Sequence, residues 1–386
     1  MKGGIYPDFH IPTEIFIKQD LIADIGNIIS QYGQKFVLIT TSSDFEQFSD
    51  VIETIASIST QHGIGCIIYD EIPENPDTEY IDSAVYFTKK SNCDIIVGFG
   101  GIESINSAKA VSLLTNNNLF CKDLFDVDEV NKPIPLITIP TQPIFGFEIL
   151  PLFFITEIRN FTKNVYSNRY LFPKTTIIDP KISTILDDET TANSGISSLS
   201  IATESVISNK SNDLINTYAL KSIDLIFKNL LNAYRDPKDP APRHQLAVAS
   251  IMSGFAFSIT GLSISLSLSL ALSSRIEIPI ARLMGLILPH VMEYNLTVSS
   301  GKYVQMSKVM DENIKDITVI EAAIKAVEGV RKLEIDVEIP QRLSQFDFPK
   351  TELTRVAEIA FRYPFIENAP RPLSRDEIET ILIAAY

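Results

Sequence analysis

The sequence is poor in the side chains from which disulfides and many metal or nucleophilic sites are built. It has three cysteines and four histidines in 386 residues. Cys66, Cys93 and Cys121 are too few for a disulfide framework, and none of them forms a CxxC motif. The four histidines, at positions 10, 62, 244 and 290, give no basis for a Ser-His-Asp constellation.

Positive charge is also scarce. Lys and Arg number 33 against 48 Asp and Glu, which gives a net charge of −15. This balance argues against binding nucleic acid or an anionic membrane through a general basic surface. The GxSxG, GxxxxGKS/T and HExxH motifs are absent as well. Because no apolar signal segment follows the start, we expect a cytoplasmic protein.

Charged residues are missing altogether from residues 246–274, a run long enough to cross a bilayer. Its many serines, together with Gly254 and Gly261, favour the other interpretation, which is buried helices in a protein core. Residues 263–274 alternate with the period of a strand, but a strand would have no partner in a helical half. We therefore predict helices throughout this run and no membrane contact.

Short apolar runs recur in the first half of the chain, at residues 36–40, 65–69, 94–98 and 135–139. Amphipathic stretches of helical length separate them. Continuous apolar runs joined by helices are typical of buried parallel strands with right-handed crossovers. The first half is therefore predicted to be an α/β domain with a Rossmann-like parallel sheet, although this architecture alone does not give function.

The second half has the pattern of an all-helical domain. Long helical periodicities dominate after residue 180. Near the end, Ser374 and Glu377 form a capping box that predicts a final helix. We predict an α/β nucleotide-binding-type domain at 1–180 and an all-helical domain at 181–386.

Several segments resemble the iron-containing alcohol dehydrogenase family, a branch of the dehydroquinate-synthase-like fold, and they follow the family's order along the chain. They are residues 11–16, Gly100 and Gly101 with residues 107–110, residues 139–141 with Gly146 and Glu148, residues 288–295 and residues 370–374. The resemblance implies two domains, NAD(P) on the first, a divalent metal held by the second, and hydride transfer between the cofactor and an alcohol or aldehyde. It also implies a homodimer.

The positions that hold the metal ligands in this family carry other residues here. The family's GMDALTHAIE motif supplies an aspartate and a histidine, which match Ser197 and Ile201. Two further histidines match Leu266 and Ile280. Three aliphatic side chains and one hydroxyl cannot neutralise a dication. We therefore expect neither iron nor zinc.

The residues that match the family's dinucleotide site are Gly100, Gly101, Asn106, Lys109 and Thr141, and these are our candidate cofactor-binding residues. Such a turn binds pyrophosphate through backbone N–H groups at a helix N-terminus. The residues around this turn differ from those of the family. Glu103 stands where the family has a serine, and Pro143 has no N–H to offer to a phosphate. We expect no cofactor, with NAD(P) left open as an alternative. An exposed helical lysine is the simpler interpretation of Lys109 and Lys163.

Three hypotheses for function follow from the resemblance and its departures. The first is a pseudoenzyme that keeps the fold for an interaction, scaffold or regulatory role, with an unknown protein partner. The second is a metal-independent NAD(P)-dependent oxidoreductase acting on aldehydes or keto acids. Its rebuilt site would use Ser197, Ser200, Glu204, Ser267 or Arg275. The third is a conventional metal-dependent alcohol dehydrogenase, which the four ligand positions oppose.

Overall fold

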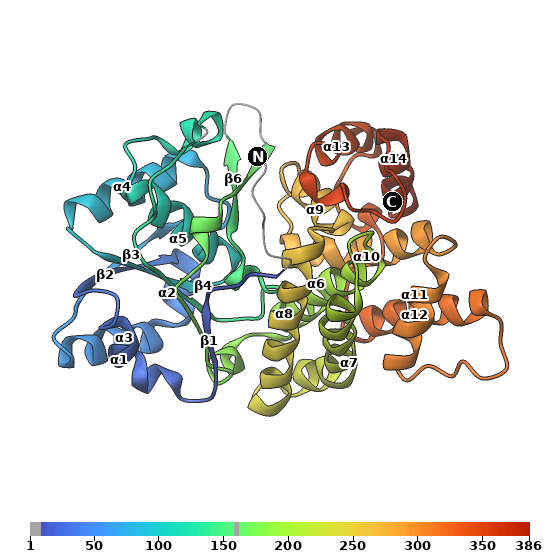
Figure 1. Cartoon of the computed structure of the whole chain (residues 1–386), viewed down its shortest axis with the longest axis horizontal. Coiled ribbons are helices and arrows are strands. Elements are labelled where there is room, and N and C mark those ends of the chain that lie inside the picture. Colours follow the sequence, from blue (N-terminus) through green and yellow to red (C-terminus); the bar gives the residue numbers. More distant parts are fainter. Residues whose placement is uncertain (1–8, 128, 158–161) are drawn as a thin grey trace.

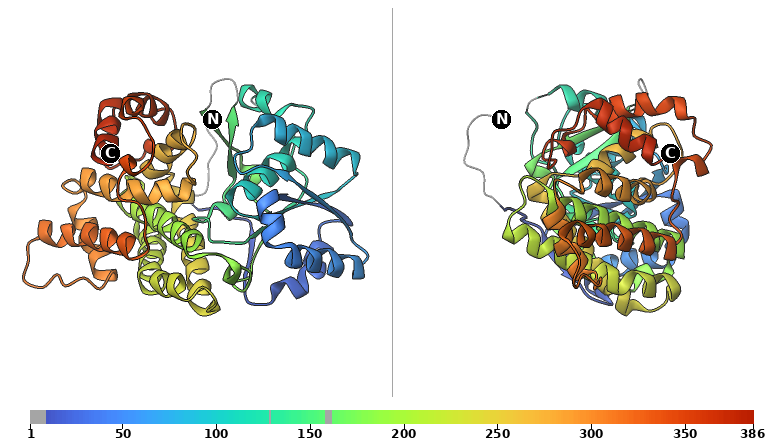
Figure 2. Two further views of the ribbon diagram at one scale, coloured as in Figure 1. Left: turned by 180° about the vertical axis from the view of Figure 1, so that it is seen from behind. Right: turned by 90° about the vertical axis from the view of Figure 1, so that its right-hand side faces the viewer.

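The computed structural model describes residues 9–127, 129–157 and 162–386. An α/β part and a helical part lie side by side, as Figure 1 and the left view of Figure 2 show. The first eight residues, on which the prediction of no secretory signal partly depends, lie outside the described residues.

A six-stranded parallel sheet forms the centre of the α/β part, in the order β1-β8-β5-β4-β2-β3. A separate antiparallel pair, β6 and β7, was not predicted. The strands are β1 (Glu14–Ile17), β2 (Lys35–Thr41), β3 (Gly65–Ile72), β4 (Ile95–Gly100), β5 (Leu136–Pro140), β6 (Leu152–Glu157), β7 (Thr162–Ser167) and β8 (Thr175–Ile178). The four predicted apolar runs coincide with β2 to β5, so the parallel sheet is confirmed.

Helices cover both faces of the sheet because its strands bury side chains on both sides. In β2, Val37 and Ile39 share a core with α4 and α5, whereas Phe36 and Leu38 share a second core with α1 and α3. The helices of this part are α1 (Ile25–Ile29), α2 (Ser42–Gln47), α3 (Ser49–Gln61), α4 (Thr78–Lys90) and α5 (Ile102–Thr115). The continuous apolar runs of the sequence are explained by this burial on two faces.

The helical part begins after β8, and none of the described residues beyond Ile178 lies in a strand. Its helices are α6 (Asp188–Ile207), α7 (Asp213–Arg235), α8 (Pro240–Thr260), α9 (Ile264–Ser273), α10 (Ile280–Asn295), α11 (Ser300–Val309), α12 (Val319–Asp336), α13 (Leu353–Ala360) and α14 (Arg375–Ala384). The predicted capping box of Ser374 and Glu377 is confirmed at the start of α14. The boundary at residue 180 itself stays a prediction.

The uncharged run contains α8 and α9, and the predicted helix over its alternating serines is confirmed. Gly261 ends α8 in the left-handed region at φ 56°, and the Ser263 side chain caps α9 by accepting from the N–H of Leu266. The axes of the two helices differ by 99°. Across the described residues, no single helix is long and apolar enough to span a membrane; only α8 and α9 taken together reach that length and composition.

The two parts meet backbone against backbone at Gly146 and Gly254. Gly146, which precedes the short 3-10 helix η3 (Phe147–Ile149), has φ 77°, and a Cβ on it would lie 2.2 Å from the Cα of Gly254 in α8. The N–H of Gly146 also donates to Ser250 Oγ at 2.9 Å. Neither glycine can therefore carry a side chain without separating the α/β part from α8.

Candidate functional site

The turn between β4 and α5 is the first part of the candidate site. Gly100 ends β4, and Gly101 is the N-cap residue of α5. Gly100 has φ 133°, and a Cβ there would lie 2.0 Å from Asp44 Oδ2, so only glycine fits. Thr141 belongs to the same turn, because its N–H donates to the Gly100 carbonyl at 3.1 Å. The structure thus brings three of the five candidate cofactor-binding residues together.

The carboxylate of Asp44 occupies the N-terminus of α5. Its Oδ2 accepts hydrogen bonds from the backbone N–H of Gly101 at 3.0 Å and from Ser104 Oγ at 2.7 Å. Burial raises the pKa of the Asp44 carboxyl, and the hydrogen bonds from Ser104 and Gly101 oppose that rise. The N-terminus of a helix stabilises an anion. Here that anion is a side chain of the protein itself.

Asn106 and Lys109 are tied to the segment that leads into β6. Asn106 Oδ1 accepts a hydrogen bond from the N–H of Phe154 at 2.9 Å. Lys109 Nζ donates to the carbonyls of Phe147 at 2.5 Å and Leu152 at 3.0 Å. The Lys109 side chain is completely buried, so the interpretation as an exposed lysine is wrong. These contacts hold the fold together, and cofactor binding by the two residues stays a prediction.

A cavity of about 610 Å³ lies between the α/β part and the helical part, next to the start of α5. We call it the interdomain cavity. It is lined by Pro73, Glu74, Asn75, Tyr80, Glu103, Lys163, Ser273, Ile276, Glu277, Ile278, Pro279 and Ile280. Its volume is within the range of small-molecule sites.

Lys163 in β7 and Glu103 in α5 both line this cavity and attract each other electrostatically. The Lys163 side chain is 6% exposed, and its Nζ donates to Asn75 Oδ1 at 2.5 Å and to Thr156 Oγ1 at 3.2 Å. Burial lowers the pKa of Lys163, against the attraction of Glu103. Burial likewise raises the pKa of Glu103, and the charge of Lys163 opposes that rise. The interpretation of Lys163 as an exposed lysine is therefore also wrong.

The four positions that match the family's metal ligands do not fit a metal ion. Ser197, Ile201 and Leu266 have no exposed surface, and Ile280, which is 3% exposed, lies in the wall of the interdomain cavity. The three aliphatic residues belong to one hydrophobic core cluster. The one oxygen present, Ser197 Oγ, donates to the Ser194 carbonyl at 3.0 Å. A divalent transition metal needs several N, O or S ligands, which these positions do not supply.

Metal-binding side chains are not gathered elsewhere in the described part of the chain either, where no three or more His, Cys, Asp and Glu residues form a group suited to an ion. Burial lowers the pKa of His290 in α10 to about 4, which leaves the imidazole in the neutral form that can bind a metal, but His290 belongs to no such group. The fit of a metal therefore fails on the chemistry of the side chains present.

The polar residues of the hypothetical rebuilt site do not converge on the interdomain cavity. The hydroxyl of Ser200 donates to the Ile196 carbonyl at 3.1 Å, and that of Ser267 donates to the Ser263 carbonyl at 3.1 Å. Both serines are completely buried in helices, whereas Arg275 is exposed. Hydroxyls that bond to their own helix offer little to a substrate.

Glu204, the remaining residue of that set, caps α9 from inside the core. Its carboxylate accepts hydrogen bonds from Ser263 Oγ at 3.0 Å, from the N–H of Ile264 at 2.5 Å and from the N–H of Ser265 at 3.0 Å. Burial raises the pKa of Glu204 to about 7, although these hydrogen bonds oppose the rise. Its position indicates a structural role.

We expect Glu204 to make the stability of the protein depend on pH. Its pKa is higher in the folded chain than the usual value of about 4.3, so folding favours the protonated form. Its contribution to stability is complete below about pH 4.3 and is lost as the pH rises through about 7. The loss is roughly 1.4 kcal/mol for each unit of the shift. Urea unfolding between pH 5 and pH 8 should show a steeper fall for the wild type than for Glu204→Gln, and parallel profiles would contradict this assignment.

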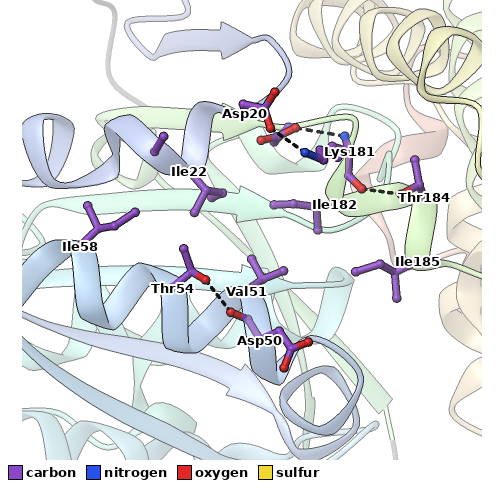
Figure 3. Close-up of a pocket in the computed structure, with 12 residues that line it drawn as sticks. Asp20, Ile22, Asp50, Val51, Thr54, Ile58, Lys181, Ile182, Thr184 and Ile185 are labelled. Atoms are coloured by element: carbon purple, nitrogen blue, oxygen red, sulfur yellow. Dashed lines mark hydrogen bonds and ion pairs between the residues drawn. The ribbon is translucent and has the colours of Figure 1, made fainter.

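A second cavity, of about 530 Å³, lies between the α/β part and the segment that follows β8, and it is shown in Figure 3. It is lined by Asp20, Ile22, Ala23, Asp50, Val51, Thr54, Ile58, Asp179, Lys181, Ile182, Thr184 and Ile185. Two of its charged groups are engaged with each other, since Lys181 Nζ pairs with Asp20 Oδ1 at 2.8 Å. None of the candidate site residues lines it.

Sequence analysis missed two features of the site. The role of Asp44 was missed because no local sequence pattern marks it. Its carboxylate reaches the N-terminus of α5 only in the folded chain. The environment of Lys163 was missed because its partner Asn75 is far away in the sequence and lies in the loop after β3. Glu103 was noted as a change of charge, but its pairing with Lys163 was not predicted.

Comparison with known proteins gives a consistent result along the whole chain. The family model described as "Iron-containing alcohol dehydrogenase" matches residues 12–180. The model described as "Fe-containing alcohol dehydrogenase family, C-terminal" matches residues 191–386. The 1,3-propanediol dehydrogenase of Klebsiella pneumoniae is 25% identical over 98% of this chain and 98% of its own length. The NAD-dependent methanol dehydrogenase of Bacillus methanolicus is 24% identical over 97% of this chain and 98% of its own.

Solved structures show the same fold. The alcohol dehydrogenase from Oenococcus oeni has a TM-score of 0.94 at 22% identity, covering 99% of this chain and 100% of its own. The sulfoacetaldehyde reductase from Bifidobacterium kashiwanohense, in complex with NAD⁺, has a TM-score of 0.87 at 20% identity, covering 99% of each chain. The predicted fold class is therefore confirmed.

The prediction of no cofactor, and of neither iron nor zinc, is contradicted by these relatives and is wrong. The matching family is iron-containing, one relative is NAD-dependent, and a protein of the same fold holds NAD⁺. The prediction was drawn from changed side chains. A dinucleotide bound at such a turn is held largely by backbone N–H groups, which a change of side chain does not remove.

Proposed function

Because this chain belongs to the iron-containing alcohol dehydrogenase family, we propose that it keeps the family's fold without metal-dependent hydride transfer and acts as a pseudoenzyme with a regulatory role. The observation that carries the proposal is the set of four ligand positions. Ser197 is bonded to its own helix, and Ile201, Leu266 and Ile280 are part of the hydrophobic core.

The chemistry explains why these positions matter for the reaction. A metal ion assists alcohol and aldehyde chemistry by polarising the reacting oxygen. A substrate oxygen that reached the inner wall of the interdomain cavity would meet Ile280, which cannot polarise a carbonyl or stabilise an alkoxide.

NAD is the cofactor that the relatives' names lead us to expect, and its binding is compatible with a regulatory role. The two glycines of the β4–α5 turn remain, and Thr141 closes the turn beside them. A dinucleotide bound without turnover would then act as a signal. A cytoplasmic homodimer, with neither nucleic acid nor membrane as a partner, is part of the same proposal.

The proposal is tested by an assay for turnover. We expect no NAD(P)-linked oxidation of 1,3-propanediol or methanol and no reduction of lactaldehyde, whether iron or zinc is added or left out. The rate should be at least about a thousandfold below that of the Klebsiella pneumoniae relative in the same assay, which corresponds to about 4 kcal/mol of transition-state stabilisation.

Two positive results would overturn the proposal in different ways. Turnover that depends on added metal would show that the conventional reaction survives. Turnover that persists with a chelator would favour a metal-independent oxidoreductase with a rebuilt site. Loss of that activity in Lys163→Met, with retention in a variant of an exposed lysine such as Lys238→Met, would then locate the reaction in the interdomain cavity.

A further inference from the structure

Lys163 is a buried lysine in the wall of a cavity. Its side chain is 6% exposed, and it belongs to the residues that line the interdomain cavity. The backbone of Lys163 is held in β7, where it lies directly opposite Thr156 in the register of β6 and β7. The amine is therefore placed at the cavity by a regular strand pair.

The hydrogen bonds of Lys163 run to two neutral acceptors. The Thr156 hydroxyl donates to Asn75 Oδ1 at 3.1 Å, so the Thr156 oxygen is left to accept from Lys163 Nζ at 3.2 Å. Lys163 Nζ also donates to Asn75 Oδ1 at 2.5 Å. A neutral amine has two N–H groups and one lone pair, and these two acceptors match its two N–H groups. The arrangement suits the neutral form, whose lone pair is a nucleophile.

Burial favours the uncharged forms of both ionisable groups in this part of the wall. It lowers the pKa of Lys163 and raises the pKa of Glu103, while the attraction between their charges opposes both shifts. A neutral amine and a protonated carboxyl that line the same cavity supply a nucleophile and a proton donor. These are the two groups that the condensation of an amine with a carbonyl compound requires.

The rest of the wall selects among carbonyl compounds. Ile276, Ile278 and Ile280 give it apolar surface for a short alkyl chain. Glu74 and Glu277 are exposed side chains that also line it, and their carboxylates repel an incoming carboxylate. No second Lys or Arg is present among the described residues of the wall to attract an acid. An uncharged aldehyde therefore fits better than a keto acid.

We propose that Lys163 binds a small uncharged aldehyde covalently in the interdomain cavity by forming a reversible imine. The lone pair of Nζ attacks the carbonyl carbon, and the resulting carbinolamine loses its oxygen as water, so that a C=N bond replaces the C=O bond. Glu103 gives the proton that the departing oxygen needs and takes up the proton that the nitrogen releases. Because no oxidation state changes, this step uses neither a metal nor a dinucleotide.

This site goes beyond the proposed function, and the two proposals fail separately. If no imine forms and no NAD(P)-linked turnover is found, only the lysine site is wrong. If an imine forms and the aldehyde is also reduced with NAD(P), the lysine site stands and the pseudoenzyme proposal fails. Imine formation without turnover supports both.

Reductive trapping tests the site directly. The full-length protein is incubated near pH 7 with butyraldehyde and sodium cyanoborohydride, which reduces an imine to a stable secondary amine, and labelled lysines are identified by peptide mass spectrometry. A lysine with the usual pKa of about 10.4 is only about 0.04% neutral at this pH. We expect Lys163 to be labelled at least about tenfold faster than the exposed Lys238. Labelling of Lys163 no faster than that of Lys238 overturns the proposal.

A matched pair of variants tests the part of Glu103. Glu103→Gln keeps the size of the side chain and removes the proton donor, whereas Glu53→Gln makes the same change at an exposed position of α3. With cyanoborohydride in excess, so that imine formation limits the rate, we expect labelling of Lys163 to slow about tenfold in Glu103→Gln only. An unchanged or faster rate in Glu103→Gln would overturn its role as the proton donor.

A charged aldehyde tests the choice of ligand. Succinic semialdehyde is butyraldehyde with a carboxylate at its far end, so it offers the same reacting group with one negative charge. We expect it to label Lys163 more slowly than butyraldehyde at low salt and the difference to shrink as salt is added. Labelling by succinic semialdehyde that is as fast or faster would overturn the preference for an uncharged aldehyde.

Discussion

Replacing Leu266 with alanine is expected to lower the free energy of unfolding by about 2–5 kcal/mol. Leu266 has no exposed surface and belongs to the same hydrophobic core cluster as Ile201 and Ile280. Removing most of its side chain takes away buried apolar contact and leaves space that the surrounding helices fill only in part. Such a loss is a large fraction of the total stability of a typical protein.

A surface leucine provides the matched control. Leu214, near the start of α7, is 47% exposed, so Leu214→Ala makes the same chemical change with little loss of packing. Urea unfolding followed by far-UV circular dichroism suits both variants, because the chain contains no tryptophan. A Leu266→Ala protein as stable as Leu214→Ala would contradict the assignment of this position to the core.

The burial of Leu266 also predicts the effect of placing a histidine there, which is the metal ligand that the family has at this position. Leu266→His would place an imidazole among apolar side chains, and the residues that the structure describes include no group of metal-binding side chains that it could complete. Burying a polar group without a partner costs roughly 1–3 kcal/mol in addition to the lost packing. We therefore expect Leu266→His to be no more stable than Leu266→Ala, by the same urea measurement. A histidine variant as stable as the wild type would show that the site tolerates the ancestral residue.

Asp44→Ala is expected to strengthen the binding of NAD⁺ by at least about tenfold, or 1.4 kcal/mol. The Asp44 carboxylate accepts from the Gly101 N–H and Ser104 Oγ, where a dinucleotide phosphate would bind. Removing it frees these donors and removes a negative charge that would repel the phosphate. Asp44→Asn should give a smaller gain, because it removes the charge but keeps an acceptor at the helix N-terminus.

Isothermal titration calorimetry with NAD⁺ measures this effect directly. Asp50→Ala is the control, because Asp50 is exposed in the neighbouring helix α3 and its removal changes the net charge by the same amount. The gain should be confined to Asp44 and should shrink as salt is added, since screening weakens the repulsion that is removed. If Asp44→Ala binds NAD⁺ no better than Asp50→Ala, Asp44 does not compete with the phosphate.

Much of the fold was predictable because it depends on local patterns. The apolar runs at β2 to β5 indicate strands that are buried on both faces of the sheet, and the capping box at Ser374 indicates the start of a helix. The run 263–274 shows the limit of such patterns. Taken alone, its alternation predicts a strand. The run forms the helix α9 instead, because it is surrounded by helices and the Ser263 side chain caps its first turn.

The candidate site was less predictable because its key contacts join distant residues. Asp44 and Gly101 are brought together only by the neighbouring positions of β2 and β4 in the sheet. Lys163 meets Asn75 through the approach of β7 to the loop after β3. A single sequence gives the identity of such residues but not their partners, which explains why two buried lysines were interpreted as exposed.

The contact of Gly146 with Gly254 has a mechanical consequence for the protein. Two bare backbones that touch leave no side chain to bend or change rotamer, so sliding of one half past the other would meet main-chain atoms at once. This contact obstructs a rotation about the two glycines less than it obstructs sliding. Such a hinge rotation would widen and narrow the space between the two halves.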